Sequence, residues 1–255
     1  YFLEDVYMGA YFYFGIMEEF KMFKSKSLRN YFSRNEKILW CTSVILIVIS
    51  FFIFDRVNYL TLAASLIGVT SLIFDAKGNP FGQLLMVIFS VLYGIISYSF
   101  SYYGEMATYL GMTAPMSIFA LISWIKNPHN GNQSEVEIAT LNKKDIAVML
   151  FLTMIVTVIF FFLLRAFHTA NLVPSTLSVM TSFLAVYLTY KRSAFFALAY
   201  AANDMILIVL WSLAALTDIS YLSVITCFVL FFINDSYTYL NWTRIYKRQN
   251  TEKIC

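Results

Sequence analysis

Two strongly apolar stretches of the chain each contain an Asn-Asp pair with a tryptophan eight residues after the Asn. The first pair is Asn203-Asp204, which precedes Trp211, and the second is Asn234-Asp235, which precedes Trp242. Ionisable groups inside a membrane are costly and usually mark a pathway. An amide offers both a donor and an acceptor, and an indole face gains roughly 0.5–2 kcal/mol from a cationic ring. The motif therefore predicts a pocket for a small polar ligand with a heterocyclic ring.

Helical periodicity extends this pocket. Phe195 and Trp211 recur at intervals of four residues with Asn203, so they share its face. Asn241 and Trp242 share a face with Asn234 in the same way. The neighbouring acids, Asp204 and Asp235, point about 100° away and either line the pocket or bind an adjacent helix.

Two alternatives remain open for these residues. A single Asn can instead join two helices, a contact worth about 0.6 kcal/mol. Trp242, which lies close to Arg244, can belong to the aromatic belt at the membrane surface.

The first half of the chain adds polar residues within its apolar stretches. Gln83 and Tyr93 lie on one side of residues 80–98, and Ser117 lies within residues 105–125. We include all three among the substrate-binding candidates. Pro115 frees a backbone carbonyl and predicts a kink. Glu105 suits the first turn of a helix, so a structural role is favoured there.

Sequence motifs of enzymes are absent. There is no Gly-x-x-x-x-Gly-Lys-Ser/Thr loop, no His-Glu-x-x-His and no Gly-x-Ser-x-Gly. The two histidines lie in or beside loops, and the three cysteines lack metal or redox spacing. We expect a conduit that is not an enzyme and needs neither cofactor nor metal.

Composition identifies the elements that hold these residues. Apolar residues make up 60% of the chain and the mean hydropathy is +0.69, which excludes an ordinary soluble domain. The sequence predicts an all-α polytopic membrane protein with eight transmembrane helices. The predicted spans are residues 38–54, 59–74, 80–98, 105–125, 146–164, 175–190, 194–213 and 219–242.

Basic residues set the orientation of the spans. Sixteen of the eighteen Lys and Arg residues fall in one alternate set of connecting segments, and only Arg56 and Arg165 fall in the other. Cationic loops stay in the cytoplasm, so both termini and the loop at 126–145 should be cytoplasmic. The basic residues form no single stripe, so nucleic-acid binding is excluded.

The two halves of the chain look related. Lys77 precedes Trp124 by 47 residues, and Lys191 precedes Trp242 by 51. We predict two parallel three-helix units joined by a linking span. The predicted parts are an amphipathic cytoplasmic segment (1–37), an additional helix (38–54), a first unit (55–125), a linker loop with its span (126–174), a second unit (175–243) and a cytoplasmic tail (244–255).

Several strings resemble the PnuC family of vitamin transporters. They are "LIFDAKGNPFGQLLMVIFSVLYGIISYSFSYYGEM", "APMSIFALISWIKNP", "YAANDMILIVLW" and "FFINDSYTYLNW". The resemblance implies a homotrimer in the bacterial inner membrane and a three-plus-one-plus-three helix plan similar to SWEET sugar carriers. It also implies a central site in each protomer for nicotinamide riboside. Transport would be facilitated diffusion, with the substrate trapped by phosphorylation in the cytoplasm.

The resemblance has departures that leave other functions open. Phe195 and Ala199 stand where many members have two tryptophans, and Ser117 stands where a Gln is common. Thiamine or riboflavin are therefore alternative substrates. A scaffold or sensor that transports nothing is an alternative of another class. Proton coupling is disfavoured, because only Asp204 and Asp235 could form a relay of facing acids.

Overall fold

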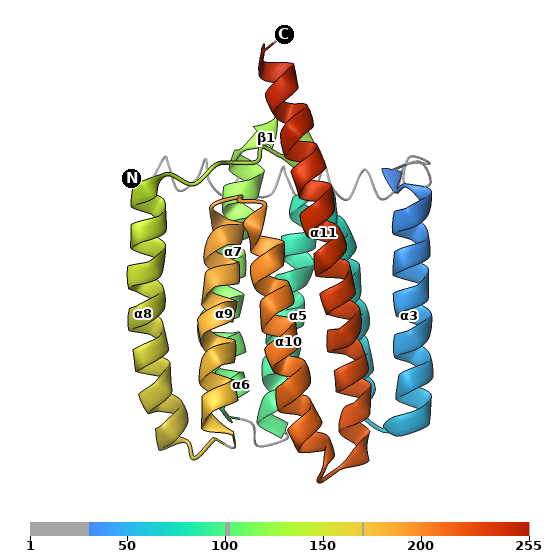
Figure 1. The fold of residues 1–255 in the computed structure, drawn as a ribbon. Helices are drawn as coiled ribbons and strands as arrows, with labels where there is room; N and C mark the ends of the chain where they lie inside the picture. The colour runs from blue at the N-terminus through green and yellow to red at the C-terminus, as the bar shows by residue number, and fades with distance from the viewer. Residues whose placement is uncertain (1–30, 100–102, 170, 255) are drawn as a thin grey trace, which may run out of the picture.

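The computed structural model describes residues 31–99, 103–169 and 171–254, and this part of the chain is almost entirely helical (Figure 1). Eight segments in it are long and apolar enough to cross a membrane, as the sequence predicts. The predicted amphipathic segment falls mostly on residues 1–30, outside the described residues. The helices are α3 (Arg34–Phe54), α4 (Tyr59–Ala76), α5 (Pro80–Ser99), α6 (Tyr103–Thr108), α7 (Ala114–Lys126), α8 (Lys143–Ala166), α9 (Leu172–Tyr190), α10 (Phe195–Ala215) and α11 (Leu222–Ile254), with a π-helical turn η1 (Tyr109–Thr113) and a 3-10 turn η2 (Ile219–Tyr221).

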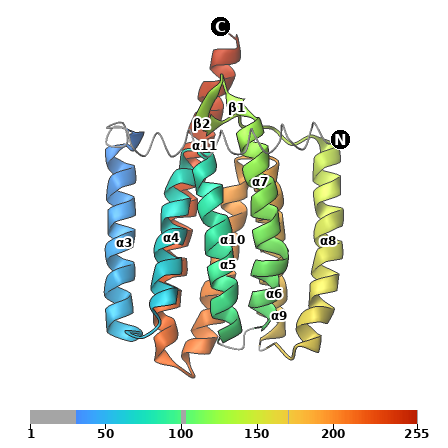
Figure 2. The same cartoon turned by 180° about the vertical axis from the view of Figure 1, so that it is seen from behind.

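Six of the described helices pack side by side in a closed ring, in the order α4, α5, α7, α9, α10, α11 and back to α4. The other two long helices stand outside this ring. α3 packs on α4 and α11, and α8 packs mainly on α9, as Figure 2 shows from the reverse side. Only 6% of the most apolar window of α8 is buried. The ring therefore encloses the core, and α8 presents its side chains outward.

The turn from α4 to α5 and the turn from α9 to α10 have the same geometry. Gly78 has a φ of +68°, and Arg192 takes the corresponding place with a φ of +56°. In the first turn the amide of Asn79 donates to the carbonyl of Phe74 at 3.1 Å, and the second turn repeats this bond at 3.0 Å. The correspondence continues into the next helix, because the amides of Gly82 and Phe196 donate to the carbonyls of Asn79 and Ser193, each at 3.0 Å.

Two buried tryptophans join the halves of the ring reciprocally. The indole of Trp124, on α7, donates to the carbonyl of Thr189 on α9 at 2.9 Å. The indole of Trp242, on α11, donates to the carbonyl of Asp75 on α4 at 2.7 Å. Both rings are completely buried, and their centroids lie 5.3 Å apart. Each half thus ends in an indole bonded to the first helix of the other half.

At one end of the bundle α11 continues beyond the ring and meets a short hairpin, β1 (Pro128–His129) and β2 (Asn132–Val136). The side chain of Gln249 fixes this contact, since its amide oxygen accepts from the amide of Ile138 at 2.9 Å and its nitrogen donates to the carbonyl of Val136 at 3.0 Å. Residues 126–145 were predicted only as a polar linker. Residues 244–255, predicted as a tail, continue α11 as far as Ile254.

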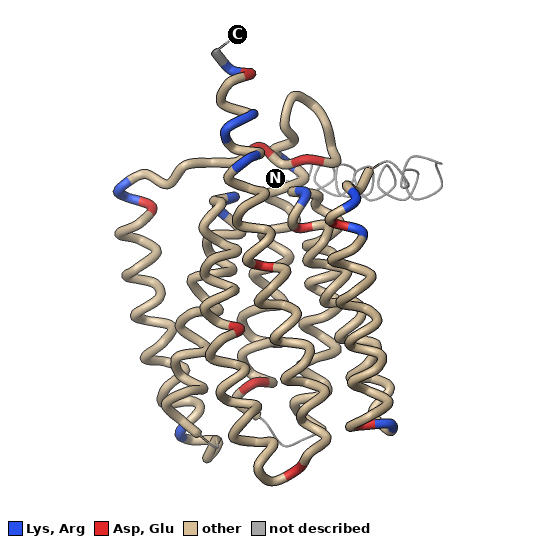
Figure 3. The backbone as a smooth tube through the Cα atoms, turned by 45° about the vertical axis from the view of Figure 1, so that its right-hand side comes forward, with Lys and Arg blue, Asp and Glu red and all other residues tan. Residues whose placement is uncertain are grey.

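Basic residues gather at this same end of the bundle (Figure 3). Within the described residues, twelve of the fourteen Lys and Arg residues lie there, and Arg56 and Arg165 lie at the opposite end, where α3 and α8 stop. The asymmetry predicted from the sequence is therefore present in three dimensions. Acidic residues, in contrast, also occur within the bundle.

Candidate functional site

A narrow cavity lies inside the ring, and five of the six ring helices (all but α7) contribute side chains to it, together with the turn η1. Its volume is about 30 Å³, room for only one or two water molecules. A nucleoside-sized molecule can enter only if side chains or helices move apart. The cavity is lined by Leu72, Met86, Phe89, Tyr109, Thr113, Ser182, Tyr200, Asn203, Asp204, Phe228, Phe231 and Asp235.

Two carboxyl groups lie next to each other in the wall of this cavity. Asp204, from α10, and Asp235, from α11, are only 3% and 2% exposed and lie close enough to share a hydrogen bond. The remaining oxygens, Oδ2 of Asp204 and Oδ1 of Asp235, have no hydrogen-bond partner among the described residues. Both acids therefore line the cavity, which resolves an orientation that the sequence left open.

Asn203 lies beside this pair and is held by hydroxyl groups of α9. Its amide oxygen accepts from Thr181 at 2.9 Å, Ser182 at 3.0 Å and Ser178 at 3.3 Å. Spacings of three and four residues place the three hydroxyls on one side of α9. Asn203 thus combines the two roles considered for it, since it joins α9 to α10 and also borders the cavity.

Asn234 occupies a different environment. Its amide nitrogen donates to the hydroxyl of Ser43, on α3, at 3.1 Å and to the carbonyl of Leu230 at 2.8 Å. It does not line the cavity. The structure places this residue at the contact between α11 and α3, while the neighbouring Asp235 faces inward.

Aromatic rings and a widened helical turn form another wall of the cavity. Tyr109 and Thr113 begin and end the π-helical turn η1, immediately before Pro115. The hydroxyl of Thr113 donates to the carbonyl of Thr108 at 3.4 Å, and Pro115 cannot donate at all. A π-helical turn thus precedes the proline at which the sequence predicts a kink. Such turns often occur at functional sites.

Two other predicted residues pack behind this wall. The ring centroids of Tyr93 and Tyr109 lie 4.4 Å apart, and those of Tyr93 and Trp211 lie 6.3 Å apart. Both side chains are buried in the apolar core around the cavity. They support its wall without lining it.

Three further candidates lie around the end of α4, near the basic end of the bundle. Gln83 donates to the carboxylate of Asp75 at 2.8 Å. Asn241 donates to the carbonyl of Ala76 at 2.7 Å, and Trp242 donates to the carbonyl of Asp75. These contacts hold the ends of α4, α5 and α11 together. Ser117 is also buried and outside the lining, and its hydroxyl has no partner among the described residues.

Comparison with known proteins identifies the family of this chain. The family model described as nicotinamide mononucleotide transporter matches residues 58–244, which is well over half of the chain. The chain belongs to this family. Every residue that lines the central cavity falls within the matched range.

Relatives in the transporter family and a solved structure are similar over most of their length. The nicotinamide riboside transporter PnuC of Neisseria mucosa is 24% identical over 78% of this chain and 77% of its own. The protein of the same name from Haemophilus influenzae is 23% identical over 84% and 92%. A crystal structure of the vitamin B3 transporter PnuC aligns with a TM-score of 0.74 at 22% identity, covering 86% of this chain and 94% of that one. That likeness shows the fold.

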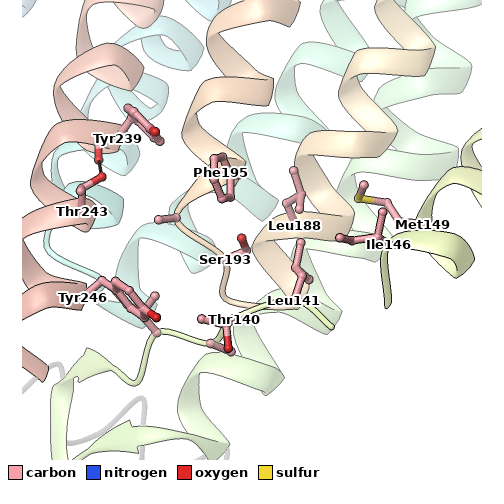
Figure 4. Close-up of a pocket in the computed structure, with 13 residues that line it drawn as sticks. Thr140, Leu141, Ile146, Met149, Leu188, Ser193, Phe195, Tyr239, Thr243 and Tyr246 are labelled. Atoms are coloured by element: carbon pink, nitrogen blue, oxygen red, sulfur yellow. Dashed lines mark hydrogen bonds between the residues drawn. The ribbon is translucent and has the colours of Figure 1, made fainter. Parts of the chain in front are cut away.

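A second, larger cavity in this transporter-family chain lies at the basic end of the bundle and shares no lining residue with the first (Figure 4). Its volume is about 580 Å³, and its walls are mostly apolar side chains from α8, α9, α10, α11 and the linker before α8. Phe195 lines this groove and packs near Tyr239, with ring centroids 6.1 Å apart. The predicted ring-stacking residue therefore lies away from the carboxyl pair. We take the smaller cavity as the candidate site because Asn203, Asp204 and Asp235 line it.

The prediction from sequence missed most of the aromatic and apolar lining. Tyr200 and Tyr109 line the same cavity as the carboxyl pair, yet neither was among the predicted site residues, although Tyr200 begins the string "YAANDMILIVLW". Tyr200 lies three residues before Asn203, so helical spacing alone could have indicated it. Phe89, Phe228 and Phe231 resemble any other apolar residue of a span, and only the order of helices around the ring brings them together.

Proposed function

We propose that this protein carries nicotinamide riboside across a bacterial inner membrane by facilitated diffusion, with the substrate gradient as the driving force and phosphorylation in the cytoplasm as the trap. The observation that carries the proposal is a polar cavity enclosed by the ring of helices in a chain of this transporter family. The sequence contains no nucleotide-binding loop that could supply energy from ATP hydrolysis. The curated relatives are named for the riboside.

The charge of the cavity favours the riboside over the mononucleotide for which the family model is named. The lining contains two carboxyl groups and no Lys, Arg or His. A phosphate group there would meet like charge in a medium of low dielectric constant and would find no basic partner. The riboside lacks that phosphate.

The same proposal includes the organisation of the chain. Residues 55–125 and 175–243 act as two equivalent three-helix units, with α8 as the link, α3 as the additional helix and a plan similar to that of SWEET carriers. The matching turns at Gly78 and Arg192 support the equivalence, and so do the reciprocal indole bonds of Trp124 and Trp242. Movement of one unit against the other would open the cavity to either side.

We also propose how the chain is oriented in the membrane and how its protomers assemble. The basic end is cytoplasmic, so both termini lie inside the cell, as the distribution of charge indicates. The protomers form a homotrimer. The little-buried apolar faces of α3 and α8 offer surface for such contacts and for lipid.

Within the pocket, Asn203 and Asp204 contact the ligand directly, and Tyr93 and Trp211 hold the aromatic wall. Gln83, Asn241, Trp242 and Ser117 position the helices at the cytoplasmic side. Phe195 borders the groove at that side of the pathway.

Calorimetric titration of the purified protein with nicotinamide riboside, thiamine and riboflavin tests the substrate directly. We expect heat of binding with the riboside and much weaker binding of the other two vitamins. Tighter binding of thiamine or riboflavin would replace the proposed substrate by that vitamin. Binding of none of the three would favour the scaffold or sensor.

A further inference from the structure

Asp204 and Asp235, the acids of the central cavity, lack partners that Asp75, another buried acid of the ring, has. Asp75, for comparison, accepts from Gln83 at 2.8 Å on one oxygen and from Ser71 at 3.4 Å on the other. Asp204 and Asp235 each keep one oxygen without a partner among the described residues, although both side chains are at least 97% buried. Those oxygens belong to residues that line the cavity.

Among the residues that the structure describes, no basic side chain neutralises the pair. The Lys and Arg residues of the described chain lie at the two ends of the bundle, while acidic residues occur inside it (Figure 3). A buried carboxylate without a counter-charge lowers the stability of the fold, and such groups inside a membrane mark function. The missing positive charge is therefore expected from the ligand.

The hydrogen bond between Asp204 and Asp235 limits the negative charge that the two groups carry together. Two carboxyl groups can share a hydrogen bond only if one of them carries a proton, so the bonded pair holds at most one negative charge. A ligand with one positive charge is the matching partner. The rings of Tyr109, Tyr200 and Phe89 line the same cavity and add faces that attract a cation.

We propose that Asp204 and Asp235 together make this cavity selective for ligands whose ring carries a positive charge. The proposal rests on the proposed function in taking the central cavity as the binding site. In nicotinamide riboside the ring nitrogen bonds to the ribose, which makes the ring a pyridinium. The carboxyl pair binds that ring, and a neutral ring of the same shape leaves the pair without a counter-charge.

A matched pair of ligands tests this selectivity. The probes are nicotinamide riboside and the neutral riboside in which carbon replaces the ring nitrogen. They are titrated against the wild-type protein, the double variant Asp204→Asn/Asp235→Asn and the control Asp75→Asn. Thermal unfolding in detergent confirms that each variant is folded. We expect the wild type and Asp75→Asn to prefer the cationic riboside by about 10- to 150-fold. The double variant, which has no carboxyl group in the cavity, should bind the two ligands with similar affinity.

The outcomes separate this inference from the choice of vitamin. Equal binding of both ribosides by the wild type overturns the inference, and so does a preference that survives in the double variant. If neither riboside binds, thiamine (a cation) and riboflavin (neutral) replace them. Binding of thiamine that is lost in the double variant supports the inference while refuting the proposed substrate. Binding of riboflavin alone overturns the inference.

Discussion

Asn203 and Asn234 occupy the same position in their two motifs, but their side chains have different partners. Asn203 accepts three hydroxyl groups of α9 and borders the cavity. Asn234 donates to Ser43 on the outer helix α3. Helical periodicity shows which residues share one face of a helix, but it does not show which other helix packs against that face. The sequence could therefore predict an interior role for both residues and could not separate them.

Replacing each Asn with Leu should separate the two roles. Asn203→Leu removes a polar group of the cavity, and it also leaves hydroxyls of α9 without their acceptor. We expect the change to weaken the binding free energy by about 1–3 kcal/mol. We expect affinity for nicotinamide riboside to fall roughly 5- to 150-fold. Asn234→Leu should bind as the wild type does, because its partner lies on α3. Calorimetry on both variants checks this; normal binding by Asn203→Leu would show that the amide only joins helices.

The helices themselves were largely predictable, because apolar length and charged ends define a membrane span without knowledge of its neighbours. Eight spans were expected, and eight such segments occur in the described residues. The hairpin β1–β2 was not predicted, since its seven residues contain no alternating apolar pattern. The extension of α11 to Ile254 was also missed. The charged residues of this extension are typical of an unstructured tail, and the sequence does not show that Gln249 binds the linker.

The reciprocal indole bonds allow a test of the equivalence of the two three-helix units. Trp124→Phe and Trp242→Phe each remove one of the two donors to a buried carbonyl, since the amides of Arg192 and Gly78 still donate to those carbonyls. Each change should destabilise the protein by about 1 kcal/mol, the net value of one hydrogen bond. Trp40→Phe is the matched control, because its indole donates to Thr70 at a more exposed place. It should change stability by less than about 0.5 kcal/mol. Thermal unfolding in detergent measures all three; a large loss for one ring tryptophan with none for the other would argue against equivalence.

The whole molecule combines a sealed ring with a strong asymmetry of charge between its ends. The ring encloses a cavity too small for the substrate, so transport requires an arrangement in which the units separate. The distribution of Lys and Arg predicts the orientation of that ring in the membrane. The charge asymmetry could be predicted from the sequence, because the positions of Lys and Arg are visible there. The closure of the ring could not, because it depends on packing between distant spans.

Labelling of single cysteines should report the orientation. Gln133→Cys lies in β2 at the basic end, and Asp218→Cys lies next to η2 at the other end. In a background without the native cysteines, an impermeant maleimide added to intact cells should label Asp218→Cys alone. Labelling of Gln133→Cys from outside would reverse the predicted topology.

Flux into liposomes that contain only the purified protein tests facilitated diffusion of nicotinamide riboside most directly. The membrane potential is held at zero with valinomycin and equal potassium on both sides, because the substrate is a cation. Uptake should saturate with substrate, stop when the inside and outside concentrations are equal, and reach the same plateau under an imposed proton or sodium gradient. Accumulation above the outside concentration under either gradient would contradict the account, and so would the absence of any protein-dependent uptake.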